Sequence, residues 1–197
     1  MPHLDLPALV QLFGYPGVAG MIFLESGVPF GFFLPGASLL FTAGLLAGQG
    51  FFNPWILVPL VTLAAVLGDN VGYWIGAHWG VKLFVRPDSR FFRHSHLEKA
   101  KAFYEQYGKQ AVFLGRFVPV VRTFVPIVAG IVRMDYRTFL AYNIASGFVW
   151  AAGVTLLGVF LGGIPFVENN FSAIILLVIA FTCMPLVWEY WKSQKAK

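Results

Sequence analysis

The chain has 197 residues, of which 58% are hydrophobic and only 12% are charged, and its mean hydropathy is +0.72. Soluble domains carry about 25% charged residues, so this composition excludes an ordinary water-soluble domain and indicates that lipid is the solvent. The length suits one membrane domain covering residues 1–197, and the net charge of +5 is informative through where the basic residues lie. The lone cysteine, Cys183, excludes an internal disulfide.

The N-terminal segment, Met1 to Gly17, has no Lys or Arg before its apolar residues. We therefore expect no cleavable signal peptide. The segment is typical of a short amphipathic stretch at the membrane interface, and Pro16-Gly17 predicts where it ends.

The first apolar block runs from Val18 to Ala47 and is interrupted only by Glu25. It is longer than the roughly 20 residues of a simple span. Pro29 and Pro35 lie in its middle, where backbone groups freed by helix breaks would need partners within lipid. Both observations predict a re-entrant hairpin that enters and leaves the membrane on one side.

The second block, Trp55 to Trp79, has the length of a transmembrane helix and aromatic residues at both ends. It carries an acidic residue, Asp69, inside the span. The connector that follows, Lys82 to Lys109, has seven basic and three acidic residues, with apolar residues at near-helical spacing. This pattern predicts an amphipathic helix on an anionic membrane face.

The third block, Gln110 to Val132, contains two arginines, Arg116 and Arg122, beside two prolines, Pro119 and Pro126. An arginine at membrane depth costs about 2.5–3.5 kcal/mol on insertion scales, so these side chains are expected to face a protein-lined cavity that binds an anion. The prolines predict a second re-entrant hairpin. A turn at Pro119 can bring both guanidinium groups to one point, an arrangement that suits phosphate.

The fourth block, Phe139 to Gly163, and a C-terminal block at about residues 171–191 are predicted transmembrane helices. Basic residues gather in the connector, at Arg133 and Arg137, and in the C-terminal tail, whereas the N-terminal segment and residues 163–170 contain no Lys or Arg. The positive-inside rule therefore places the connector and the C-terminus in the cytoplasm.

The two halves of the chain resemble each other. Tyr15 to Glu25 can be aligned with Tyr107 to Arg116, and the same offset of about 91 residues places Pro35 on Pro126. The repeats would cover about residues 15–80 and 107–163, each a broken hairpin followed by a span. The predicted fold is an all-α polytopic membrane protein with two inverted repeats, an amphipathic connector and an extra C-terminal transmembrane helix. This design is found in many secondary transporters.

Four ionisable residues are candidate site residues, each with an alternative. Glu25 is either a proton-titratable group and arginine partner or an interfacial carboxylate at the hairpin mouth. Asp69 is either a second proton-coupling carboxylate or part of a salt bridge between helices. Arg116 and Arg122 either bind a phosphate together or reach separately to the cytoplasmic headgroups.

Metal and enzyme chemistry find little support in the sequence. His94 and His96 lie in the basic connector without a cysteine or further histidine nearby, so no metal site is predicted. No nucleophile–base pair emerges, so we expect a protein that is not an enzyme. No cofactor and no nucleic-acid partner are predicted.

Four segments carry a resemblance to a known family: FLESG, LPGASLLFTAGLLA, GDNVGYWIGAHWG and GRFVPVVRTFVPIVAG. Together they resemble the DedA family of bacterial membrane proteins, which share a domain with eukaryotic lipid scramblases of the VTT type. The resemblance covers about Val18 to Gly163. It implies two facing re-entrant hairpins, an essential acid at Glu25 and essential arginines at Arg116 and Arg122. Family members often have an acid after LPG, where this chain has Ala37.

The resemblance implies transport of undecaprenyl phosphate across the cytoplasmic membrane of a bacterium, with a link to proton-motive force. The leading hypothesis is therefore a lipid-phosphate flippase whose arginines bind the phosphate and whose Glu25 competes for them or takes a proton. The first alternative is a proton-coupled exporter of small ions or drugs that uses Glu25 and Asp69. The second is a non-transporting envelope scaffold. The oligomeric state stays open.

Overall fold

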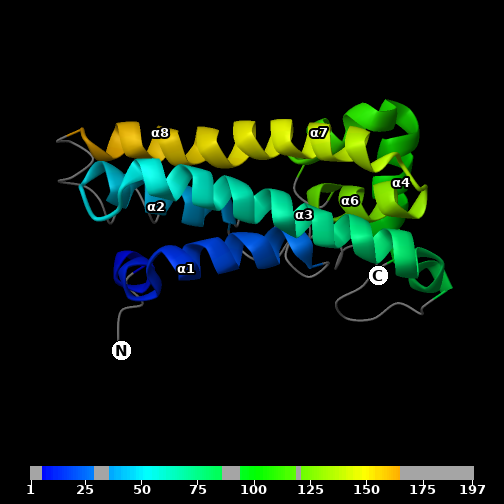
Figure 1. Ribbon diagram of the computed structural model, residues 1–197, viewed down its shortest axis with the longest axis horizontal. Helices are drawn as coiled ribbons and strands as arrows, with labels where there is room; N and C mark the ends of the chain where they lie inside the picture. Colours follow the sequence, from blue (N-terminus) through cyan, green and yellow to red (C-terminus); the bar gives the residue numbers. More distant parts are fainter. Residues whose placement is uncertain (1–5, 29–35, 86–93, 119–120, 165–197) are drawn as a thin grey trace, which may run out of the picture.

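The computed structural model describes residues 6–28, 36–85, 94–118 and 121–164, and every regular element within them is helical (Figure 1). The longer helices are α1 (Leu6–Gly27), α2 (Gly36–Gly48), α3 (Pro54–Val85), α4 (His94–Tyr107), α6 (Val121–Ile131), α7 (Tyr136–Gly147) and α8 (Gly153–Gly162). The short elements are η2 (Gly108–Gln110), α5 (Ala111–Gly115) and the π-helical turn η3 (Phe148–Ala152). The predicted C-terminal helix at about 171–191, with Cys183, lies outside the described residues.

Two helical stretches are long and apolar enough to cross a membrane, Pro54–Gly80 and Tyr136–Gly162, each of 27 residues. At 1.5 Å per residue, each is about 40 Å long and exceeds a hydrocarbon core of about 30 Å. The second stretch is built from α7, η3 and α8 end to end. The two central spans predicted from the sequence are thereby confirmed as helical, and their bounds agree with these stretches to within three residues, although α3 itself continues to Val85.

The N-terminal helix breaks earlier than the sequence predicts. Gly14 has φ 56° and ψ −158°, a conformation that a side chain would disfavour, and the helix resumes directly after it. Pro16 then lies in the first turn of the resumed helix, where its missing N–H has no helical acceptor to lose. The prediction that Pro16-Gly17 ends the first segment is therefore wrong, because the break falls at Gly14.

Helices α2 and α6 each pack against the long helical stretch that lies in the other half of the chain. Helix α2 lies along α8, and α6 lies along α3 (Figure 1). Glycines allow the close approach: Gly44 and Gly158 face each other between α2 and α8, and a Cβ on Gly130 would overlap the backbone of α3. Small residues at such contacts are typical of helices that pack within lipid.

Buried apolar side chains form two clusters. One joins α1, α2 and α3 through residues such as Ile22, Leu40 and Leu57. The other joins α4, α5, α6 and α7 around Phe124 and Phe139. Large apolar side chains also cover the outside, and these include Leu63, Leu67 and Trp74 on α3, and Phe148, Leu157 and Phe160 on the second span. An apolar outer surface of this kind suits a lipid environment.

The connector helix α4 has the amphipathic character that the sequence predicts. Its charged residues Glu98, Lys101 and Glu105 are exposed, whereas Ala100 is fully buried. Phe103 and Tyr104 pack against the second cluster, so the apolar face of α4 covers α6. Contact between α4 and an anionic membrane face stays a prediction.

Candidate functional site

Four ionisable side chains from four separate segments converge in the interior. Glu25 comes from the end of α1, Asp69 from the middle of α3, Arg116 directly follows α5, and Arg122 is in the first turn of α6. Glu25, Asp69 and Arg116 are all less than 7% exposed. They line one cavity of about 10 Å³ together with Arg122, Ser26, Thr123 and Trp150. The four residues that the sequence singled out therefore belong to one site.

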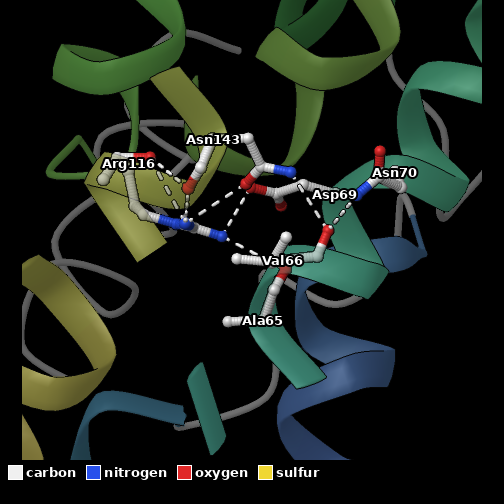
Figure 2. Close-up of polar contacts among 7 residues, drawn as sticks. Ala65, Val66, Asp69, Asn70, Arg116 and Asn143 are labelled. Carbon is white, nitrogen blue, oxygen red and sulfur yellow. Dashed lines mark hydrogen bonds and ion pairs between the residues drawn. The ribbon is translucent and has the colours of Figure 1, made fainter. Parts of the chain in front are cut away.

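The guanidinium group of Arg116 donates hydrogen bonds to several acceptors on α3 and α7 (Figure 2). Its Nη2 donates to Asp69 Oδ2 at 2.5 Å and to the Ala65 carbonyl at 3.2 Å. Its Nη1 donates to Asn143 O at 3.2 Å, Asn143 Oδ1 at 3.4 Å and Ser146 Oγ at 3.3 Å. The two terminal nitrogens carry four N–H groups, so these acceptors occupy their donor capacity. Arg116 thus ties α3 to α7.

Polar side chains on α3 and α7 support this arrangement. Asn143 donates from Nδ2 to Val66 O at 3.0 Å, which orients its amide oxygen toward Arg116. Ser146 donates to the Asn143 carbonyl at 3.1 Å. Gly147 leaves room for the guanidinium, because an added Cβ would lie 2.6 Å from Nη1 of Arg116. The Arg116–Asp69 pair is therefore built into the contact between the two spans.

Arg122 has fewer polar partners than Arg116 among the described residues. It forms an ion pair with Glu25 through Nη2 and Oε1. The same carboxylate oxygen accepts the backbone N–H of Gly36, at 3.2 Å, at the first residue of α2. Glu25 Oε2 is buried and has no hydrogen-bond partner among the described residues. This pair joins α1, α2 and α6, the helices of the two predicted hairpins.

Trp150 completes the site. Its ring centroid lies 5.2 Å from Cζ of Arg122 and 5.9 Å from Cζ of Arg116, within the range of cation–π attraction. It belongs to the π-helical turn η3, and such turns are frequent at functional sites. The sequence interpretation missed Trp150, although Asn143, Ser146 and Trp150 follow the i, i+3, i+7 spacing of one helix face.

The geometry separates the alternatives left open by the sequence. The alternative in which Arg116 and Arg122 reach separately to headgroups does not describe this site. Both arginines line the same cavity, and both guanidinium groups lie near the ring of Trp150. Asp69 forms a salt bridge with Arg116 that joins two helical segments, as its alternative role predicted. Its role in proton coupling, and that of Glu25, stay predictions. With all four residues ionised, the site is neutral and has no free positive charge for an anion.

The chain is similar to known bacterial membrane proteins over most of its length. The family model of the VTT domain matches residues 34–160. An uncharacterized membrane protein of Mycobacterium tuberculosis (strain ATCC 25618 / H37Rv) is 46% identical, over 92% of this chain and 81% of that protein. Protein DedA of Escherichia coli (strain K12) is 41% identical, over 98% of this chain and 92% of that protein. No solved structure matches the chain.

Proposed function

The chain belongs to the DedA family of VTT-domain membrane proteins, and on this premise we propose that it is a flippase that carries undecaprenyl phosphate across the bacterial cytoplasmic membrane. The observation that carries the proposal is a pair of arginines that line one cavity between apolar helices. Arg116 is buried and Arg122 is partly buried, and Glu25 is the one carboxylate paired with Arg122 among the described residues. A lipid with a phosphate head and a long apolar tail suits such a site, because its tail can stay in lipid while its head passes between helices.

The two arginines have different parts in this proposal. Arg116 donates to five acceptor atoms, so it cannot turn to a ligand without breaking the contact between the spans. Among the described residues, Arg122 makes one ion pair, and Trp150 lies beside it. Arg122 is therefore the first ligand of the phosphate, and Arg116, paired with Asp69, fixes the position of the neighbouring wall of the site.

The charge balance of the site indicates how Glu25 would control phosphate binding in this proposal. A phosphate monoester brings about 1.5–2 negative charges at neutral pH. It would bind poorly to a neutral site, and it would bind well to Arg122 once the Glu25 carboxylate has moved away or taken a proton. The exchange of Glu25 for phosphate on Arg122, and back again on the other side, is the proposed transport step. Proton uptake by Glu25 would link this step to proton-motive force.

The described conformation is closed. A cavity of about 10 Å³ holds about one water molecule and is too small for a phosphate group. Opening requires the helices that carry Glu25 and Arg122 to separate, and these belong to the two predicted hairpins. The reciprocal packing of α2 on α8 and α6 on α3 supports an inverted repeat, in which one half can move against the other. The C-terminus would be cytoplasmic.

Transport of labelled undecaprenyl phosphate in vesicles that contain the purified protein tests the proposal. Arg122→Ala removes a charge-assisted contact worth about 1.5–3 kcal/mol, so transport at low substrate should fall by at least about tenfold. Arg137→Ala is the matched control, because Arg137 is exposed on α7 and outside the site. Equal transport by wild type and Arg122→Ala would contradict the proposal.

A second candidate is a proton-coupled transporter of small ions or drugs. It is favoured by the two buried carboxylates, Glu25 and Asp69, that line the same cavity. Proton flux into vesicles that lack undecaprenyl phosphate and other lipid phosphate monoesters would support this second candidate. Loss of this flux in Glu25→Gln, with no response to added undecaprenyl phosphate, would favour it over the flippase.

A further inference from the structure

We propose that the N-terminus of α2 and Arg122 form an anion cradle for a phosphate monoester, and that the Glu25 carboxylate occupies this cradle as a built-in plug. The inference rests on the proposed function and adds a ligand-binding element, the backbone at Gly36, that the family motifs do not assign. The plug and the phosphate would use the same donors and exclude each other.

The donors in the cradle come from two hairpin helices. The Gly36 N–H, at the first residue of a 13-residue helix, and Nη2 of Arg122 both donate to Oε1 of Glu25. The first N–H groups of a helix have no acceptor within the helix and carry partial positive charge. Backbone N–H groups at helix N-termini and guanidinium groups each bind phosphate in other proteins, and here one of each converges on a single oxygen.

The second oxygen of Glu25 is not satisfied by the donors of the cradle. Oε2 is buried, points into the N-terminus of α2 and has no hydrogen-bond partner among the described residues. A planar carboxylate offers two oxygens here, whereas a phosphate monoester offers three around a tetrahedral centre. Among the described residues, the donors of the cradle therefore hold one of the two oxygens of Glu25, and the other oxygen is buried without compensation.

Gly36 is required by this geometry. A Cβ at residue 36 would overlap the carboxylate of Glu25, so no other residue leaves the space open. With Glu25 shortened to alanine, a Cβ at position 36 would instead project into the vacated space. The cradle can thus be emptied and blocked by two small substitutions.

The test measures dissociation constants of the full-length protein in detergent, with inorganic phosphate and farnesyl phosphate as probes. Glu25→Ala should bind both probes at least tenfold more tightly than wild type. Glu25→Ala with Gly36→Ala should lose this gain, because the new methyl group fills the cradle. Gly20→Ala is the matched control, since a Cβ there meets no atom within 4 Å. Much tighter binding of farnesyl phosphate than inorganic phosphate identifies a lipid ligand, and equal binding identifies the free anion.

Two outcomes overturn the cradle: Glu25→Ala that binds no more tightly than wild type, or a double variant that binds as tightly as Glu25→Ala. If Glu25→Ala fails to fold, Glu25→Gln keeps the volume, removes the charge and should still bind more tightly than wild type. Arg122→Ala separates the two proposals. If it abolishes binding while position 36 has no effect, the cradle fails and the proposed function stands. If it binds farnesyl phosphate as wild type does, both fail.

Discussion

Arg116 and Asp69 form an ion pair with 2.5 Å between Nη2 and Oδ2, and it joins the segment after α5 to the middle of α3. The two residues are 47 positions apart in the chain, and both are buried. The Arg122–Glu25 pair, by contrast, joins helices of the two predicted hairpins. The site thus combines an arginine that donates to five acceptor atoms with an arginine that makes one ion pair among the described residues.

The Arg116–Asp69 pair should matter for stability. We expect Asp69→Ala to lower the free energy of unfolding by about 3–5 kcal/mol, because it leaves the Arg116 charge buried without its carboxylate. Thermal unfolding in detergent measures this. The double variant Asp69→Ala/Arg116→Ala should lose less than the sum of the single variants. Additive losses would contradict a direct coupling between the two residues.

Trp150 should act on binding through the arginines. Loss of a cation–π contact worth about 0.5–2 kcal/mol predicts that Trp150→Leu raises the KM for lipid phosphate by about 2- to 30-fold. Trp150→Phe keeps an aromatic ring and should therefore retain most of the affinity that Trp150→Leu loses. A side chain that only fills space would not need an aromatic ring. Trp55→Leu is the control, since Trp55 is 88% exposed. A fall in kcat with unchanged KM in Trp150→Leu would argue against this role.

The contact between short and long helices gives a prediction about the repeat. Gly44 lies at the contact of α2 with α8 and Gly130 at the contact of α6 with α3, and a Cβ on either would overlap the backbone of the facing helix. We expect Gly44→Val and Gly130→Val each to destabilise the protein by about 1–3 kcal/mol through overpacking. Gly153→Ala serves as the control, because a Cβ there meets no atom within 4 Å. If only one of the two valine variants is destabilised, the halves are not equivalent in packing.

The sequence could predict the outline of this site but not its pairing. Apolar length located both central spans, with aromatic ends as a further sign of the first, and the cost of burying charge singled out all four ionisable residues. The choice of Asp69 for Arg116 and Glu25 for Arg122 depends on contacts between segments 47 and 97 residues apart, which single-sequence patterns do not encode. The same holds for η3, because a π-helical turn has no periodicity of its own in the sequence.

The cap of the second span gives a prediction about pH. Asp135 precedes α7, and its Oδ1 accepts the backbone N–H and the hydroxyl of Thr138, both at 2.9 Å. The backbone hydrogen bond, followed by the hydroxyl, lowers the pKa of Asp135 below its ordinary value. Because the folded pKa is the lower one, the cap stabilises the protein above the unfolded pKa of about 3.9 and loses this effect as the pH falls through the folded pKa.

Asp135→Ala should therefore lower the thermal midpoint in detergent at pH 7 and have a smaller effect at pH 3, where the wild-type carboxylate also begins to lose its charge. Asp135→Asn keeps an acceptor oxygen for the N–H of Thr138, so it should stay close to wild type at pH 7. An equal effect of Asp135→Ala at both pH values would mean that the charge of the carboxylate adds nothing to the cap. Such a result would leave the hydrogen bond itself as the stabilising contact, because a protonated Asp135 can still accept from Thr138.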